Sequence, residues 1–374
     1  MSASVNKTTI DIFFELMRAG LWERDVWLSG FCNINYADLY QIAEEQSVVG
    51  LLTVGLEHVT DIKTPQEWSL KFIGATLQIE RQNKAMNLFL NRLLDGFRKE
   101  KIYCLLVKGQ GIAPCYERPL WRVCGDVDLF LNGENDVKAR DYLIPMASSI
   151  ENEEKYKKHL GLTIDNWVVE LHGNLYSSLS RKVEKELDDV YADTFDRGVV
   201  KSGDIAGVQV FLLGNENNVF YVFTHILQHY FHGGIGLRQI CDWCRLLWTF
   251  RGQLDQNVLR KRIEYAGLMT EWKSFAYLAV EYLGMPPMAM PFYDISAKWR
   301  KKARQIKTYI MKTGNFGQRD LGYVRKYGYF KRKICSFKST MFDMFIHLRV
   351  FPVDTIRFFM YYTCIRLNAL RRGE

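Results

Sequence analysis

A change of residue pattern in the middle of the chain limits its fold more than any other feature. From residue 8 to about 95, apolar residues recur every three or four positions, as in TIDIFFELMRAGLW, which predicts helices. Between residues 96 and 210 the pattern becomes short apolar runs separated by glycines and polar turns, which predicts strands. Helical spacing then returns. The sequence therefore predicts an α+β fold in three parts: an N-terminal helical region (1–95), a small mixed sheet core (96–210) and a C-terminal helical region (211–374).

Composition fits a reduced, cytoplasmic protein. The chain has 374 residues, 48% of them hydrophobic, which is enough for a sizeable core. Its eight cysteines are scattered rather than arranged as a disulfide framework. No apolar run approaches the roughly 18 residues that a membrane span needs. Asp11 and Glu15 interrupt the first apolar segment, so we do not expect a signal peptide.

Positive charge is concentrated at the C-terminal end. From Lys298 onward there are 19 Lys and Arg against 4 Asp and Glu, a net charge of +15 in a chain whose total is +8. Aromatic residues alternate with these charges, as in YVRKYGYFKRKICSFKSTMF and in the segment around Arg349, Arg357 and Arg366. Three interpretations stay open: basic amphipathic helices on the inner face of a membrane, an RNA-binding surface, or an ordinary helical domain whose aromatic residues are packed inside and whose Lys and Arg are exposed to solvent.

Two aspartates stand side by side in the segment GDVDLFL. Asp126 and Asp128 are two residues apart on a predicted strand at about 127–131, so their carboxylates point to the same face and repel each other. A divalent cation removes this conflict, and Mg²⁺ or Mn²⁺ favours oxygen ligands and phosphates. Because this short motif also occurs by chance, a solvated strand end is the alternative on this feature alone.

The surrounding residues favour a metal–phosphate site. An apolar run from Ile102 to Val107 predicts a buried strand, and Lys108-Gly109-Gln110-Gly111 follows it as a turn. Glycines there allow backbone N–H groups to approach phosphate, and Lys108 adds a positive charge. Glu170, in the apolar segment VVELHG, offers a third carboxylate of the kind that a two-metal site uses.

This arrangement resembles the DNA polymerase β-type nucleotidyltransferase superfamily. More closely, LLVKGQGIAPCYERPLWRVCGDVDLFL resembles the bacterial "uncharacterised nucleotidyltransferase" family, with its K-G turn, a Tyr (Tyr116), an Arg (Arg122) and G-D-x-D. The later motif of that family is D-L-H, and this chain has Glu170-Leu171-His172 there, followed by Gly173. The similarity covers about residues 10–250 and includes FFELMRAGLW and the HxxxH helix.

The resemblance implies a nucleotidyltransferase-type sheet and the transfer of a nucleoside monophosphate from an NTP, such as ATP, to a hydroxyl acceptor. It implies Mg²⁺ or Mn²⁺ held by the catalytic carboxylates Asp126, Asp128 and Glu170. It further implies two sets of residues. Those predicted to bind the nucleotide are Lys108, Gly109, Gly111, Arg122 and Gly125, and those predicted to line the substrate site are His172, His225, His229 and Asp242. The acceptor stays open: a small molecule, a sugar, a protein or an RNA end.

Other assignments compete for the same residues. A D-x-D also binds a metal and a nucleotide-sugar in glycosyltransferases, and a non-catalytic nucleotide-binding module would keep the same fold. His225 and His229 have the i, i+4 spacing of zinc ligands on a helix, although hydrogen-bonded histidines are the simpler interpretation. CDWC, Cys241 to Cys244, has the spacing of a metal or redox pair within a helical pattern. The chain has neither GxGxxG nor GxxxxGK[ST], which argues against Rossmann and P-loop sites.

Overall fold

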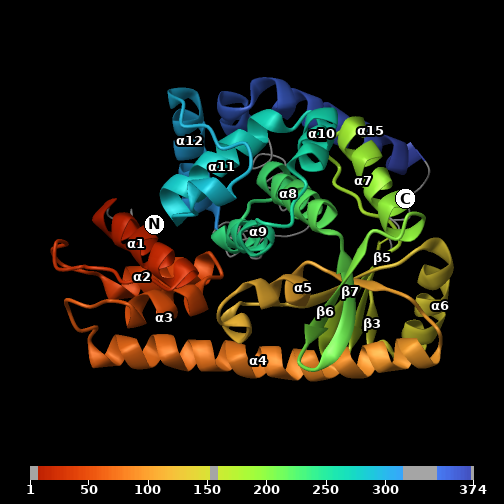
Figure 1. The fold of residues 1–374 in the computed structure, drawn as a ribbon, viewed down its shortest axis with the longest axis horizontal. Coiled ribbons are helices and arrows are strands. Elements are labelled where there is room, and N and C mark those ends of the chain that lie inside the picture. Colours follow the sequence, from red (N-terminus) through yellow and green to blue (C-terminus); the bar gives the residue numbers. More distant parts are fainter. Residues whose placement is uncertain (1–6, 152–158, 315–342, 372–374) are drawn as a thin grey trace.

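The computed structural model describes residues 7–151, 159–314 and 343–371. The predicted α+β class is confirmed: a small mixed sheet lies between one long helix and a group of helices. That long helix, α4 (Gln66–Lys99), runs along one edge of the molecule, and the sheet lies over one half of it (Figure 1).

Three shorter helices precede α4 and lie over its other half (Figure 1). They are α1 (Lys7–Trp22), α2 (Tyr36–Glu45) and α3 (Val49–Glu57). Glycines bring α1 and α3 into backbone contact. A Cβ added at Gly20 would overlap the Leu51 carbonyl, and one at Gly55 would overlap the Leu16 carbonyl. This close crossing explains why small residues interrupt otherwise apolar helices.

Five strands form the sheet in the order β1-β2-β5-β4-β3. They are β1 (Leu105–Val107), β2 (Asp126–Phe130), β3 (Ser149–Ile150), β4 (His159–Ile164) and β5 (Trp167–His172). Only β2 and β5 are parallel, and the other neighbours are antiparallel. The connections between them contain α5 (Gly109–Ile112), α6 (Gly133–Leu143) and short 3₁₀ turns at Ala113–Cys115, Pro119–Trp121 and Ile144–Met146.

The sheet has one apolar face and one mixed face, because side chains alternate along each strand. Val127, Leu129 and Leu131 from β2 and its end, with Val169 and Leu171 from β5, pack on α4 and α6 in a buried cluster. The intervening residues face the opposite way. Asp126, Asp128 and Glu170 are among these, so the apolar packing of one face fixes where the carboxylates of the other face point.

A second hairpin was not predicted. Strands β6 (Val200–Ile205) and β7 (Val208–Leu213) pair with each other beside β1, after helix α7 (Arg181–Phe195). Ala206 and Gly207, at its tip, both have positive φ, 52° and 84°. This is the geometry of a two-residue hairpin turn, and an Ala at its first position is an unusual signal because that position favours Asn, Asp or Gly.

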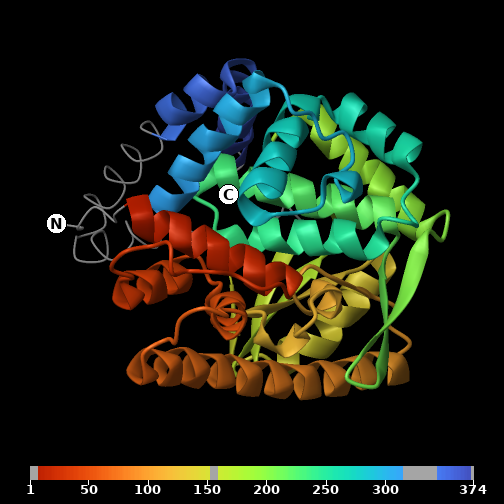
Figure 2. The ribbon, with the colours of Figure 1, turned by 60° about the vertical axis from the view of Figure 1, so that its left-hand side comes forward.

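Helices cover the mixed face of the sheet and make up most of the described residues after β7. They are α8 (Asn215–His232), α9 (Leu237–Phe250), α10 (Gln256–Ala266), α11 (Met269–Leu283), a 3₁₀ turn at Pro287–Ala289, α12 (Ala297–Thr313) and α15 (Pro352–Arg371). The N-terminal helices pack against this group (Figure 2). Trp22, for example, donates its indole N–H to the Leu283 carbonyl at 2.6 Å. One buried apolar cluster thus joins both ends of the chain, and the three-part division of the sequence stays a prediction.

Much of the basic C-terminal segment lies outside the described residues, including 323–342. Within the described part Arg349 is exposed, whereas Arg357 pairs with Asp354 at 2.9 Å and also donates to the Gly267 carbonyl. Among the described residues, none of the helices combines the length and the apolar character of a membrane span.

The α1–α3 crossing yields a test of the fold. We expect Gly55→Ala to lower the free energy of unfolding by about 2 kcal/mol or more, because the added methyl meets backbone rather than a movable side chain. The matched control is Gly74→Ala on α4, where an added Cβ meets nothing within 4 Å. That variant should raise stability by about 0.5–1 kcal/mol. Urea unfolding measures both, and equal effects at the two positions would contradict the crossing.

Candidate metal and nucleotide site

Three carboxylates come together on the mixed face of the sheet. Asp126 and Asp128 point the same way from β2, and the parallel pairing sets Asp128 directly opposite Glu170 of β5. One oxygen from each can be chosen so that all three lie within 4.8 Å of one another. Asp128 is buried, and the other two are half-buried. The predicted trio is therefore a single cluster.

The repulsion between these carboxylates is visible in the pKa of Asp126. Burial, together with the charges of Asp128 and Glu170, raises the pKa of Asp126 to about 6. Burial also acts against ionisation of Glu170, but contacts with His159 and His172 outweigh it and hold the pKa of that carboxyl well below its usual range. The cluster thus carries negative charge at neutral pH at a considerable electrostatic cost.

Lys108 supplies the nearest positive charge. It follows β1 in an unusual conformation (φ 52°), and Gly109 after it has φ 26°. This turn brings the Lys108 ammonium within 2.6 Å of the Asp128 carboxylate. Burial disfavours the charged ammonium, but Asp128, Tyr221 and Glu170 together outweigh it and raise the pKa of Lys108 well above its usual value. A Cβ at Gly109 would lie 3.1 Å from the Cys124 sulfur, so the turn needs a glycine both for its conformation and for space.

Two histidines complete the cluster. His172 Nε2 lies 2.8 Å from Asp128 Oδ1 and 3.4 Å from Glu170 Oε2. His159, on β4, is paired directly with His172 in the hairpin, and its Nε2 lies 3.3 Å from the same Glu170 oxygen. The two imidazole rings stack with centroids 4.8 Å apart. Contacts with Asp128 and Glu170 overcome the effect of burial and raise the pKa of His172.

These groups line a cavity of about 320 Å³ between the sheet and α8. His225 and His229 of α8 also line it, with their Nε2 atoms 3.0 Å apart. Burial lowers the pKa of both imidazoles, that of His229 to about 4, so both are neutral at pH 7. The predicted residues that line the cavity are Lys108, Gly109, Arg122, Asp126, Asp128, Glu170, His172, His225, His229 and Asp242.

Arg122 and Asp242 form a buried ion pair at the edge of this cavity. Two guanidinium nitrogens of Arg122 donate to the two oxygens of Asp242, each at 2.7 Å. The Tyr116 hydroxyl donates to the same carboxylate at 2.7 Å. The Tyr and Arg of the sequence motif therefore meet an aspartate from α9, more than a hundred residues away. Arg122 is held by Asp242, whereas Lys108 lies closer to the carboxylate cluster.

Two predicted glycines do not line the cavity. Gly111 is a packing position, since an added Cβ would lie 3.1 Å from the Leu106 carbonyl oxygen and 3.3 Å from a Leu212 methyl. Gly125 precedes β2, and an added Cβ there meets nothing within 4 Å. Their predicted contact with the nucleotide stays a prediction.

Several lining residues were not predicted from the sequence. The clearest is His159, for which a signal existed. Asp165 and Asn166 form the two-residue turn between β4 and β5, and counting outward from it places His159 opposite His172. Tyr221 and Arg238 also line the cavity, but no local pattern marks them, because α8 and α9 reach the site only through tertiary packing.

Neither of the two competing metal sites, at His225/His229 and at Cys241/Cys244, has a third potential ligand among the described residues. Within the described ranges, the groups of three or more potential ligands are Asp126–Asp128–Glu170 and His159–Glu170–His172. His225 and His229 belong to neither group. Cys241 and Cys244 are fully buried in α9, and burial raises the pKa of both thiols.

Comparison with known proteins agrees with this geometry. The family model described as "Uncharacterised nucleotidyltransferase" matches residues 33–284, more than half of the chain and all of the carboxylate cluster. No curated protein and no solved structure matches the chain significantly.

The crowded carboxylates yield a test with a defined sign. Because the pKa of Asp126 is raised from 3.8 to about 6, ionisation of this group costs no stability below pH 3.8, costs progressively more between pH 3.8 and about 6, and costs most above that range. In metal-free protein, Asp126→Asn should therefore raise the free energy of unfolding by about 1–2 kcal/mol at pH 7.5, and by less at pH 5.

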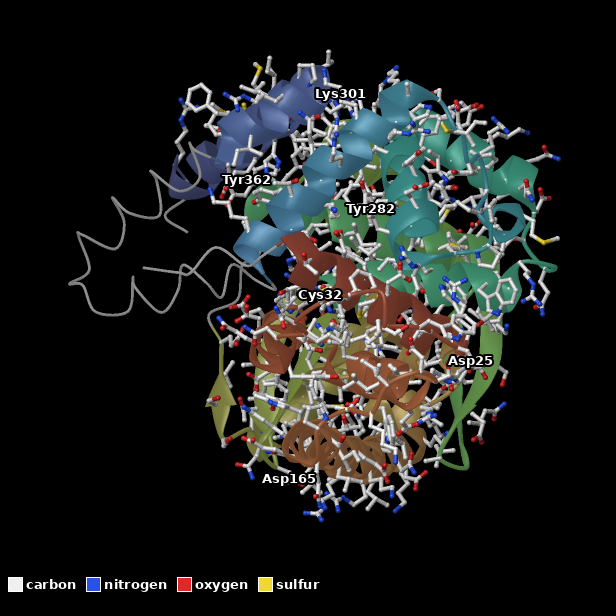
Figure 3. The ribbon with its side chains drawn as sticks, turned by 90° about the vertical axis from the view of Figure 1, so that its left-hand side faces the viewer. Asp25, Cys32, Asp165, Tyr282, Lys301 and Tyr362 are labelled. Atoms are coloured by element: carbon white, nitrogen blue, oxygen red, sulfur yellow. The ribbon has the colours of Figure 1, made fainter. Side chains whose placement is uncertain are left out.

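The matched control is Asp165→Asn, an exposed aspartate at the tip of the same sheet (Figure 3), which should change stability by less than about 0.5 kcal/mol. Urea unfolding at the two pH values gives the comparison. Destabilisation by Asp126→Asn at pH 7.5 would show that the carboxylates do not repel as described.

Proposed function

The chain belongs to the uncharacterised nucleotidyltransferase family, and from this premise we propose that it is a metal-dependent nucleotidyltransferase. In the proposed reaction an acceptor hydroxyl oxygen attacks the α-phosphorus of an NTP. The bond between the α-phosphorus and the bridging oxygen to the β-phosphate breaks, so that pyrophosphate leaves and the nucleoside monophosphate stays on the acceptor.

The carboxylate cluster is the observation that supports the proposal most strongly. Asp126, Asp128 and Glu170 present only oxygen atoms within 4.8 Å of one another, a donor set that suits Mg²⁺ or Mn²⁺. Their repulsion, visible in the raised pKa of Asp126, is relieved by a cation. Asp126 and Asp128 would hold the ion that binds the triphosphate, and Asp128 and Glu170 a second one. When bound, such ions neutralise the phosphates and lower the pKa of the attacking hydroxyl.

Side chains of the cavity provide the remaining functions. The Lys108 ammonium stands beside Asp128 and offsets negative charge that develops on the leaving pyrophosphate. Gly109 lines the cavity, and its positive φ allows the turn that carries Lys108 beside the cluster. The proton of the attacking hydroxyl passes to a carboxylate of the cluster. Arg122 is a positioning residue, since its pairing with Asp242 fastens the segment before β2 to α9.

Nucleotide binding provides the direct test. We expect at least one NTP to bind in the presence of Mg²⁺ or Mn²⁺ and to lose its affinity in EDTA. The double variant Asp126→Asn/Asp128→Asn should abolish this metal-dependent binding, because it removes two of the three charged ligands. Calorimetric titration of each NTP measures the affinities.

Two controls make the outcome decisive. Asp165→Asn should bind as the parent does, and circular dichroism should show that the double variant is folded. Asp128→Asn leaves the buried Lys108 ammonium without its partner, so the single variant Asp126→Asn serves if the double variant unfolds. Binding of Mg²⁺–NTP by Asp126→Asn at parental affinity would refute the site, and binding of nucleotide-sugars alone would favour a glycosyltransferase.

We further propose that the C-terminal helices contact an anionic membrane surface. Val353, Ile356 and Met360 project from one side of α15 and are 72%, 52% and 62% exposed. Lys298 and Lys301 are exposed on helix α12, and Lys301 lies at the end of the molecule opposite Asp165 (Figure 3). Apolar side chains beside lysines are typical of helices that lie on anionic lipid.

Vesicle binding checks this second proposal. The variant Val353→Ser/Ile356→Ser/Met360→Ser should lose most of its cosedimentation with phosphatidylserine–phosphatidylcholine vesicles. The control Leu70→Ser/Leu88→Ser removes two equally exposed leucines from α4 and should leave cosedimentation unchanged. Equal cosedimentation of both variants, or binding of single-stranded RNA but not of vesicles by the parent, would contradict the membrane assignment.

A further inference from the structure

A second group of potential metal ligands adjoins the carboxylate cluster and shares one residue with it. His159, Glu170 and His172 present two imidazole nitrogens and one carboxylate oxygen within 4.8 Å of one another. Glu170 also belongs to the Asp126–Asp128–Glu170 group, so the two groups meet at one carboxylate. His172 Nε2 lies 2.8 Å from Asp128 Oδ1, so the two groups are also in direct contact.

The spacing of these atoms matches that of ligands around one ion. Glu170 Oε2 lies 3.3 Å from His159 Nε2 and 3.4 Å from His172 Nε2. Two ligands bound tetrahedrally to a metal at about 2.0–2.1 Å stand about 3.3–3.4 Å apart. A direct hydrogen bond would be shorter, and His159 Nε2 has no hydrogen-bond partner within the described structure although it is inaccessible to solvent.

The hairpin holds the two histidines in place. His159 and His172 are directly paired on adjacent strands, which puts both side chains on the carboxylate-bearing face. Their stacked rings present the two Nε2 atoms side by side, with an angle of 11° between the ring planes. Rotation about the Cβ–Cγ bonds turns the lone pairs toward a common ion, and this torsion has a broad, shallow energy profile.

We infer that His159, His172 and Glu170 form a second metal site, selective for a borderline transition ion such as Zn²⁺ or Co²⁺ over Mg²⁺, with Glu170 bridging to an oxygen-only site at Asp126 and Asp128. The difference in ligand chemistry sets the selectivity, since imidazole suits transition ions whereas carboxylates and phosphates suit Mg²⁺. This inference deepens the proposed function by assigning its second ion to the two histidines and Glu170 instead of to Asp128 and Glu170, and it rests on that function only for the purpose of the two ions.

Cobalt titration of the nucleotide-free protein tests the site. We expect two Co²⁺ ions per chain, of which millimolar Mg²⁺ displaces one and leaves the histidine-bound ion. The visible absorption of Co²⁺ should show the intense bands of a low-coordinate site. With Cu²⁺ as the probe, pulsed electron paramagnetic resonance should show coupling to imidazole nitrogen. These readouts require no turnover and no substituted protein.

A histidine variant and a matched control show whether His159 binds the Mg²⁺-resistant Co²⁺ ion. His159→Gln should weaken the Mg²⁺-resistant Co²⁺ site at least about tenfold and reduce the visible bands, while the Mg²⁺-competed site remains. His58→Gln is the control, because His58 is also half-buried and contacts a glutamate, Glu23, at 2.8 Å, but lies outside both ligand groups. It should bind two Co²⁺ ions as the parent does.

The results separate this inference from the proposed function. One Co²⁺ per chain, fully displaced by Mg²⁺ and without nitrogen coupling, would overturn the histidine site and leave the nucleotidyltransferase proposal intact. Two Co²⁺ ions with the predicted response to His159→Gln, but no binding of any NTP, would support the site and count against the proposed function.

Discussion

Electrostatic repulsion among three carboxylates is the constraint on which this structure depends. Asp126, Asp128 and Glu170 stand on adjacent strands in a region largely removed from water, where like charges cost most. The protein offsets this cost with Lys108 beside Asp128 and with His159 and His172 beside Glu170. Burial and the charges of Asp128 and Glu170 nevertheless raise the pKa of Asp126. The crowded carboxylates therefore lower the stability of the metal-free protein and attract cations strongly.

The rest of the fold holds these charges in register. The apolar face of the sheet packs against α4 and α6, and a shift of one residue in β2 or β5 would bury the carboxylates there. On the other face, α8 closes the cavity with neutral histidines, and α9 supplies Asp242 to fasten Arg122. The helices before and after the sheet share a core, so segments far apart in sequence fix the same site.

Local patterns predicted the parts of the site that lie on single strands. Alternation placed Asp126 and Asp128 on one face, and the apolar segment around Glu170 identified the neighbouring strand. The parallel pairing that sets Asp128 opposite Glu170 depends on the order of strands in the sheet. Neither the sequence of β2 nor that of β5 predicts this order. His159 could have been found by counting from the Asp165-Asn166 turn. Tyr221 and Arg238 reach the cavity through helix packing, which leaves no local signal.

The β6–β7 hairpin was missed for a different reason. Its tip carries Ala206 at a positive φ, a position where sequence rules expect Asn, Asp or Gly, so the turn was not recognised. Arg122 shows the converse difficulty. Its place in the motif suggests a contact with phosphate, which stays a prediction, and the structure shows that two of its guanidinium nitrogens donate to the two oxygens of Asp242. A motif can indicate that a residue belongs to a site without indicating what that residue touches.

A crystal structure of the protein with Mn²⁺ and a non-hydrolysable NTP analogue would test the central claim most directly. Anomalous scattering distinguishes manganese from water and from lighter ions. We expect a manganese peak in contact with Asp126 and Asp128, with the triphosphate bound at the same ion beside Lys108. A nucleotide bound elsewhere, or manganese absent from the carboxylate cluster, would contradict it.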